Sequence, residues 1–236
     1  MTAYNLLISG GVAHDFTATS RMVADILTEV DIASEITDDV ESGLRRLADE
    51  PVDLVTVNAL RWRMEGAERY AHLSDEWGLS LSDAARAALV GHLDAGRPLL
   101  ALHAAAICFD DWDHWGFIVG ARWDWGRSTH PPVSEAAITV RTDAHPIVAG
   151  VDDFEIVDEV YGFMAEQPDI EPLALSAHGG RDHPLLWART LPGGARVVYD
   201  ALGHDERSLA HPSHRRIVRR AAAWALGRPD DVVRTL

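Results

Sequence analysis

The sequence predicts a doubly wound α/β fold with a mostly parallel sheet, and two observations support this. Short apolar segments alternate with segments whose apolar residues recur at helical spacing, which indicates strands joined by helical crossovers. The chain has 236 residues, of which 47% are hydrophobic, enough for one α/β domain with a sizeable core and short for two. We therefore expect a single domain over residues 1–236.

Strands and helices alternate most clearly in the first half of the chain. Residues 4–9 form an apolar run that ends at Gly10 and Gly11, which is typical of a buried parallel strand that meets a turn. Residues 60–78, rich in charge and tryptophan, are expected to be a surface insertion. The further elements expected in this half are strands at 31–37, 53–57 and 99–102, and helices at 19–30, 40–48, 81–95 and from Ala106 towards Gly120.

The second half of the chain is richer in strands. Its closing segment, 211–226, is expected to be a helix that ends at Gly227 and Pro229. The strands expected before it are 136–141, 154–157, 172–176, 184–189 and 196–201.

The charge of the chain limits its partners. Lysine and arginine number 21 against 37 acidic residues, so the formal net charge is −16. A surface this acidic repels phosphate backbones and anionic headgroups, so neither nucleic acid nor a membrane surface is an expected partner. A small neutral or cationic ligand and a homo-oligomer are both compatible with these numbers.

Cys108 is the only cysteine, which excludes an intrachain disulfide and a cysteine-based zinc cluster and fits a reducing cytosol. The first residues lack the basic and apolar regions of a signal peptide. No apolar run approaches the roughly 20 residues that a membrane-spanning helix needs. A cytoplasmic location is expected.

Three histidines follow predicted strands. His14 comes after the first strand, His103 after the strand at 99–102, and His204 after the strand at 196–201. Ligands of open parallel sheets bind outside the carboxyl ends of the strands, so these side chains are expected to converge in one crevice. The alternative is that each histidine only caps a turn or hydrogen-bonds to the backbone.

His103 is the most informative of the three. It lies between a buried strand and a run of alanines, the setting of the sharp turn that presents a nucleophile in α/β hydrolases. An imidazole there can act as a general base or a metal ligand, but it is a poor covalent acyl carrier compared with a thiolate. Cys108 falls within the expected following helix, and nothing near it in sequence would lower its pKa, so we interpret it as a packing residue.

Glu159 and Tyr161 follow the strand expected at 154–157. A glutamate together with several histidines can form a divalent-metal site of the kind that zinc occupies. The alternative is a solvated loop, since the sequence contains no compact metal motif.

Residues 110–126 contain four of the eight tryptophans, including Trp112 and Trp125, beside several acidic residues, including Asp111. Indole faces stack on the CH groups of a sugar while carboxylates accept bonds from its hydroxyls, so the segment suits a carbohydrate site. The alternative is that the tryptophans pack the segment against the sheet.

A series of ordered segments resembles the ThuA-like family, named for trehalose utilisation. The matching segments are residues 10–15 (GGVAHD), 102–105 (LHAA), 111–112 (DW), 145–150 (HPIVAG), 158–161 (DEVY), 184–187 (PLLW) and 196–204 (RVVYDALGH). Each segment is short, but together they span almost the whole chain in the expected order.

The resemblance implies a class I glutamine amidotransferase-like fold, which is a flavodoxin-like three-layer α/β/α sandwich. His103 stands where amidotransferases have their catalytic cysteine, and His204 with Glu206 resembles their His-x-Glu partner, so glutamine hydrolysis through a thioester is not expected. The family also implies a sugar-related role and, in some relatives, a divalent metal. The pocket it implies is formed by His14, His103, Glu159, Tyr161 and His204.

The first functional hypothesis is an enzyme that acts on a disaccharide or keto-sugar. His103, His204 and Glu159 would be its catalytic residues or the ligands of a divalent metal such as zinc. The substrate-binding residues would be His14, Asp111, Trp112, Tyr161 and Trp125. The second hypothesis is a non-catalytic carbohydrate-binding or assembly protein, and the third is a hydrolase or amidotransferase that depends on Cys108.

Overall fold

The computed structural model describes residues 2–66 and 68–236. Its centre is a nine-stranded sheet in the order β2-β1-β3-β4-β11-β10-β9-β6-β7. The strands of this sheet are β1 (Ala3–Gly11), β2 (Ile32–Thr37), β3 (Leu54–Leu60), β4 (Leu99–Leu102), β6 (Ser134–Val140), β7 (Phe154–Asp158), β9 (Pro172–His178), β10 (Arg181–Thr190) and β11 (Arg196–Asp200). A separate pair consists of β5 (Ala121–Arg122) and β8 (Ala165–Glu166).

The sheet has a parallel half and an antiparallel half. Strands β2, β1, β3, β4 and β11 run parallel to one another. From β10 onward, each strand runs antiparallel to its neighbour. Every residue of β3 and β4 is buried, as parallel strands covered on both faces require. The sheet is therefore parallel, as expected from the sequence, in the half that carries the three strand-end histidines. An antiparallel half extends it.

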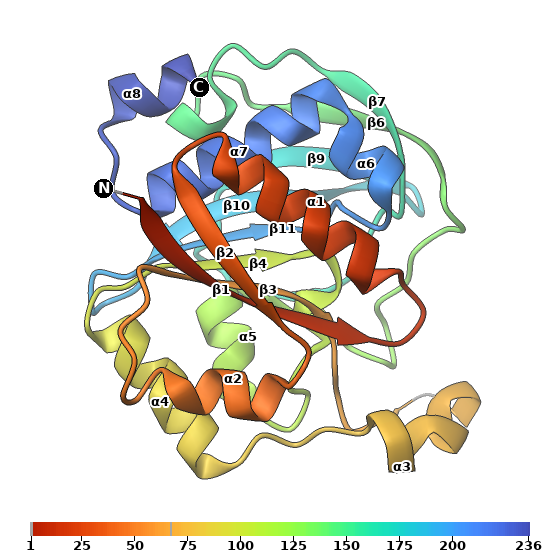
Figure 1. Cartoon of the computed structure of the whole chain (residues 1–236). Helices are drawn as coiled ribbons and strands as arrows, with labels where there is room; N and C mark the ends of the chain where they lie inside the picture. Colours follow the sequence, from red (N-terminus) through yellow and green to blue (C-terminus); the bar gives the residue numbers. More distant parts are fainter. Residues whose placement is uncertain (1, 67) are drawn as a thin grey trace.

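Helices cover both faces of the sheet, which confirms the predicted three-layer α/β/α arrangement (Figure 1). One layer contains α1 (Phe16–Thr28), α6 (Glu206–Ala210) and α7 (Pro212–Ala225). The opposite layer contains α2 (Val40–Arg46), α4 (Asp83–Asp94) and α5 (Asp113–Val119). The remaining helical elements are α3 (Ser74–Trp77), α8 (Asp230–Thr235) and the 3₁₀ turns η1 (Glu68–Leu73), η2 (His103–Ile107) and η3 (Pro146–Val148).

Two predicted helices differ from the observed ones. Helix α1 begins at Phe16 rather than Thr19, because the Asp15 carboxylate accepts a hydrogen bond from the Ala18 amide and caps the helix there. The helix expected from Ala106 towards Gly120 is interrupted: η2 ends at Ile107, and α5 starts only at Asp113. Cys108 therefore lies outside a helix, since its own backbone is extended (φ −63°, ψ 154°) and Phe109 has a φ of 54°.

The segment expected as a surface insertion, 60–78, is only partly at the surface. Trp62 is fully buried, with its ring centroid 5.2 Å from that of Tyr70 and 5.3 Å from that of Trp125. The following η1 and α3 contain no buried residue and lie at the rim of the molecule (Figure 1). Trp62 therefore anchors an otherwise exposed segment through aromatic packing. Among the described residues, no helix has the length and apolar character needed to span a membrane.

Candidate functional site

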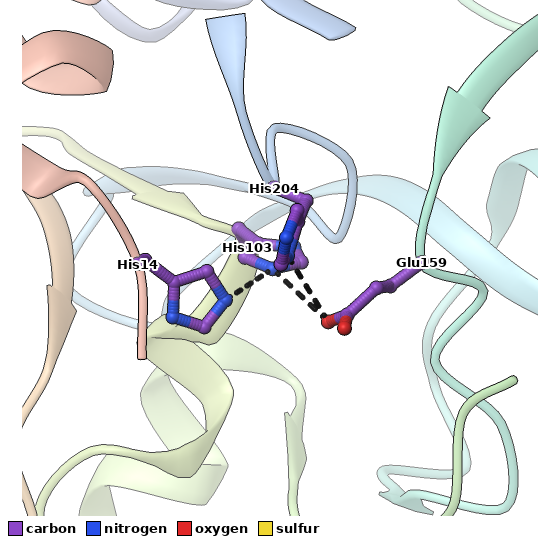
Figure 2. Close-up of side chains that lie close together, drawn as sticks. All are labelled: His14, His103, Glu159 and His204. Atoms are coloured by element: carbon purple, nitrogen blue, oxygen red, sulfur yellow. Dashed lines mark hydrogen bonds and ion pairs between the residues drawn. The ribbon is translucent and has the colours of Figure 1, made fainter. Parts of the chain in front are cut away.

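The candidate site lies at the carboxyl edge of the parallel strands, where four side chains from four separate loops meet (Figure 2). His14 follows β1, His103 follows β4, Glu159 follows β7 and His204 follows β11. Each offers one nitrogen or oxygen atom, and these four atoms all lie within 4.8 Å of one another. The structure thus brings together residues that are far apart along the chain.

His103 is held at a strained turn. Its φ of 45° lies in the left-handed region, which a non-glycine residue adopts only where the surrounding structure enforces it. The side chain is 1% exposed, and its Nδ1 lies 2.7 Å from the carbonyl oxygen of Ala201. Because a carbonyl can only accept, Nδ1 carries the proton and donates it. In the neutral ring this places the lone pair of His103 on Nε2, which faces the cluster.

His14 is arranged in the same way. Its Nδ1 donates to the carbonyl oxygen of Val12 over 3.2 Å, which leaves the lone pair on Nε2. That Nε2 lies 3.1 Å from Nε2 of His103 (Figure 2). Burial lowers the pKa of His14 to about 3, with repulsion from His103 adding to the effect, so this ring stays neutral at pH 7. Two lone pairs at this separation repel each other unless a proton or a metal ion lies between them.

Glu159 supplies the negative charge of the cluster. Its Oε2 lies 3.6 Å from His103 Nε2 and 3.3 Å from His204 Nδ1. Burial alone would raise the pKa of Glu159, but the bonds to these two histidines outweigh it and hold the pKa below its usual value. The same carboxylate raises the pKa of His204. Nδ1 of His204 is nevertheless buried without a well-formed hydrogen bond to any described residue.

These four residues fit a divalent metal ion. The separations of 3.1, 3.3 and 3.6 Å are close to the roughly 3.4 Å expected between two ligands that each lie about 2.0–2.1 Å from a common zinc-like ion. Three imidazoles and one carboxylate are a donor set that zinc and similar ions accept. The bonds from Nδ1 of His14 and His103 to backbone carbonyls fix the tautomers, as outer partners of metal-binding histidines do.

Asp158, the last residue of β7, holds two of the loops in register. This fully buried carboxylate accepts hydrogen bonds from three backbone amides, those of Glu159 (2.7 Å), Gly203 (2.8 Å) and His204 (3.3 Å). One side chain therefore fixes the backbone that carries both Glu159 and His204. Asp158 was given no role from the sequence, because its position at a strand end beside Glu159 gave no sign of contact with the β11 loop.

A cavity of about 190 Å³ lies over the cluster. Its lining includes five residues that were selected from the sequence as site residues, namely His14, Trp125, Glu159, Tyr161 and His204. The aromatic side chains around it also include residues that the sequence analysis did not assign to the site, namely Trp62, Tyr70 and Trp123.

His130 is a further residue of the site that no sequence pattern indicated. Its Nδ1 lies 3.2 Å from Glu159 Oε1, and its ring lines the same cavity. No expected strand ends at His130, so the rule that selected the other histidines could not select it. The neighbouring prolines, Pro131 and Pro132, mark only a loop.

Two predicted substrate-binding residues lie outside this cavity. Asp111 is engaged by Arg86, over 2.6 Å, and by the Ser80 hydroxyl. Trp112 lines a different cavity, one that contains none of the four clustered residues. Both were selected because carboxylates beside tryptophans suit a sugar site, and the break between η2 and α5 separates them from the cluster.

Cys108 has the environment of a packing residue. The side chain is 2% exposed, and its thiol donates to the carbonyl oxygen of Ala59 over 3.1 Å. Burial raises the pKa of the thiol to about 12, so it carries almost no thiolate at pH 7. This is the opposite of what a cysteine nucleophile requires.

A second buried pair lies behind the β11 loop and gives a prediction about pH. Nε2 of the fully buried His214 lies 3.1 Å from Asp200 Oδ2, and its Nδ1 contacts Ser208. Burial alone would lower the pKa of His214, but the charge of Asp200 outweighs it and the pKa is raised. Because the pKa of His214 is higher in the folded than in the unfolded state, the pair with Asp200 contributes its full stabilisation below the unfolded pKa of about 6.5. This contribution is lost as the pH rises through the folded-state pKa.

We therefore expect the free energy of unfolding to fall as the pH is raised from 6 into the alkaline range. His214→Gln should remove most of this dependence and lower stability by roughly 3–5 kcal/mol, because it leaves Asp200 buried without its charged partner. Urea unfolding of both proteins across this range measures the two effects. An unchanged slope in the variant would show that the pair does not titrate as described.

Comparison with known proteins gives one family and several solved structures. A family model described as ThuA, trehalose utilisation, matches residues 6–225. A ThuA-like protein from Parabacteroides merdae ATCC 43184 is 18% identical, with a TM-score of 0.77 over 96% of this chain and 91% of that chain. A ThuA-like protein from Bacteroides uniformis ATCC 8492 is 14% identical, with a TM-score of 0.68 over 95% and 91% of the two chains.

A glutamine amidotransferase from Thermotoga maritima has the same architecture. It is 11% identical, with a TM-score of 0.52 over 100% of this chain and 90% of that chain. At such identities the likeness concerns the fold, and it confirms the amidotransferase-like fold expected from the sequence.

Proposed function

The chain belongs to the ThuA trehalose-utilisation family, and from this premise we propose that it is an enzyme that acts on a disaccharide or keto-sugar at a divalent-metal site. The ligands of the metal would be His14, His103, Glu159 and His204. The family supports the sugar-related role, and the donor atoms of the cluster support the metal.

One observation carries the proposal. His14 and His103 each place Nδ1 against a backbone carbonyl, so in their neutral forms the two Nε2 lone pairs face each other over 3.1 Å beside the Glu159 carboxylate. The Tyr161 hydroxyl, 3.2 Å from His103 Nε2, can donate to that atom but leaves the lone pair of His14 without a partner. A shared cation relieves this repulsion, and the low pKa of His14 disfavours its own protonation.

When bound, a divalent ion at this cluster supplies a Lewis acid that can polarise a sugar carbonyl or activate a water molecule. The chain itself supplies the orientation of the ligands, through the carbonyls of Val12 and Ala201 and the carboxylate of Asp158. The rings of Trp62, Trp123 and Trp125 wall the cavity and exclude water, and the partly exposed Trp123 and Trp125 offer surface to a sugar ring.

Tyr161 and His130 are the groups placed to move protons in the cavity. The Tyr161 hydroxyl lies 3.2 Å from His103 Nε2, and burial raises its pKa well above the usual value, so it remains a donor. His130 lines the cavity beside Glu159 Oε1 and is half-buried, so its ring can reach both substrate and solvent.

The alternative is a carbohydrate-binding protein without catalysis, which keeps the cavity but does no chemistry. Loss of the elbow cysteine favours it, since His103 occupies that turn. A cysteine-dependent reaction has the least support, because the thiol of Cys108 is buried and its pKa is raised to about 12.

Elemental analysis of protein purified without chelators tests the proposal. We expect about one equivalent of zinc or a similar divalent ion per chain, and loss of keto-sugar turnover on dialysis against a chelator, with recovery when the ion is returned. A protein that binds no divalent ion by calorimetry yet turns over substrate would contradict the metal site. A bound sugar that stays unchanged for hours on metal-loaded protein would favour the binding protein instead.

A further inference from the structure

A second cavity, of about 370 Å³, adjoins the histidine cluster, and its lining contains none of the four clustered residues. Ile107 and Phe109 line it from the core side, while Trp112, Trp123 and Trp125 contribute aromatic surface. Its volume falls in the range of about 300–1,000 Å³ that is typical of small-molecule sites. Trp123 and Trp125 also line the cluster cavity, so the two hollows share a wall.

This shared wall is built into the fold. The backbone of Gly66 packs so closely on Trp125 that an added Cβ would lie 2.6 Å from the indole ring. Gly66 also has a φ of 87°, a conformation that favours glycine. Trp125 also lies against the buried ring of Trp62. The indole is therefore held in place before any ligand arrives, which fixes the wall between the two hollows.

The charged groups of the second cavity are paired with one another. Arg63 contacts Asp110 over 3.3 Å and Glu65 over 3.0 Å, and Arg122 contacts Asp113 over 2.6 Å. Because each guanidinium already shares its charge with a carboxylate, the pairs offer little net positive charge to a phosphate or carboxylate ligand, although their remaining N–H and oxygen atoms can bind hydroxyls. Carboxylates outnumber guanidiniums in the lining, which further disfavours an anion.

One buried donor in the lining has no partner. The indole Nε1 of Trp123 is buried and forms no hydrogen bond with any described residue. A buried donor left unsatisfied is unfavourable, by about 1–3 kcal/mol in general. Trp123 lines the second cavity and the cluster cavity, so a small movement of the indole would let this N–H donate to a hydroxyl or ring oxygen of a ligand in either hollow.

We propose that this second cavity binds a neutral sugar ring. Trp112 is its stacking face, and the paired carboxylate of Asp113 and guanidinium of Arg122 are its hydroxyl partners. Aromatic faces, neutralised polar pairs and an unsatisfied indole N–H together suit an uncharged polyhydroxylated ligand. The site is separate from the proposed metal cluster and does not depend on it.

The experiment uses the full chain with trehalose and D-glucose as neutral probes and glucose 6-phosphate as the anionic probe, measured by calorimetry and ligand-observed NMR. The His103→Ala background removes the proposed metal ligand, and variants of Trp112 and Arg122, which line the second cavity and not the cluster cavity, then assign any remaining binding to the second cavity. In that background we expect a neutral sugar to bind, glucose 6-phosphate to bind at least about tenfold more weakly than D-glucose, and Trp112→Ala to weaken sugar binding about tenfold or more.

Two further variants make the result specific. Arg122→Leu changes an exposed rim side chain that the fold does not need, and it should weaken sugar binding even if Trp112→Ala fails to fold. Trp77→Ala removes a half-buried tryptophan outside both cavities and should leave binding unchanged. The proposal is overturned if no neutral sugar binds in the His103→Ala background, if Arg122→Leu binds as the parent does, or if the phosphorylated sugar binds as well as the neutral one.

Discussion

His103→Ala is expected to reduce turnover of a keto-sugar substrate by about 10²–10⁴-fold, the range for loss of a catalytic group, and to weaken metal binding at the same time. His103 is the centre of the cluster: its Nε2 lies within 3.6 Å of His14, Glu159 and Tyr161. Alanine removes Nε2, the proposed ligand atom, and also the hydrogen bond from Nδ1 to the Ala201 carbonyl. The measurements are steady-state kinetics and the metal content of the purified variant.

The fold should survive this change, because His103 owes its conformation to the turn rather than to its ring. Alanine removes the imidazole while the flanking strand β4 and the alanines of η2 remain buried. The matched control is His114→Ala, which alters an exposed histidine on α5 away from the cluster. Full activity in His103→Ala, with the metal retained, would show that the chemistry takes place elsewhere.

The sequence could predict the parallel half of the fold because each strand there carries its own signal. The segment 99–102 is uniformly apolar and is followed by His103, and the structure places β4 at Leu99–Leu102. The rule that sites form at the carboxyl ends of such strands then selected His14, His103 and His204 without any knowledge of distances. These residues meet because parallel neighbours deliver their loops to the same edge.

The rest of the site depends on contacts that leave no local pattern. His130 reaches Glu159 from a loop with no strand before it, and Asp158 bonds to amides 45 and 46 residues further along the chain. Asp111 and Trp112, also selected as substrate-binding residues, are close to His103 in sequence but separated from it by the extended residue Cys108 and the left-handed Phe109. A backbone that reverses within two residues sends side chains to a different cavity, and composition cannot reveal this.

Asp158→Asn should loosen the site without touching any of the four clustered side chains. The carboxylate accepts from three backbone amides, two at Oδ1 and one at Oδ2. Asparagine has one oxygen in place of these two, and its NH₂ group would face a backbone N–H that is also a donor. Hydrogen bonds to a charged group contribute about 1.5–3 kcal/mol each, so we expect a loss of stability of that order. Because the same bonds set the spacing between Glu159 and His204, metal affinity should fall about 10–100-fold, as it does when an outer partner of a ligand is lost.

Two measurements separate positioning from mere stability. Competition with a chromogenic chelator gives the metal affinity, and urea unfolding of the metal-free protein gives the free energy of unfolding. Asp153→Asn is the control, since its carboxylate accepts from one backbone amide, that of Val140, remote from the cluster. It should lower stability somewhat and leave metal affinity unchanged. If Asp158→Asn destabilises the metal-free protein but binds metal as tightly as the parent, then Asp158 serves the fold alone, and the geometry of the cluster must be set by the loops themselves.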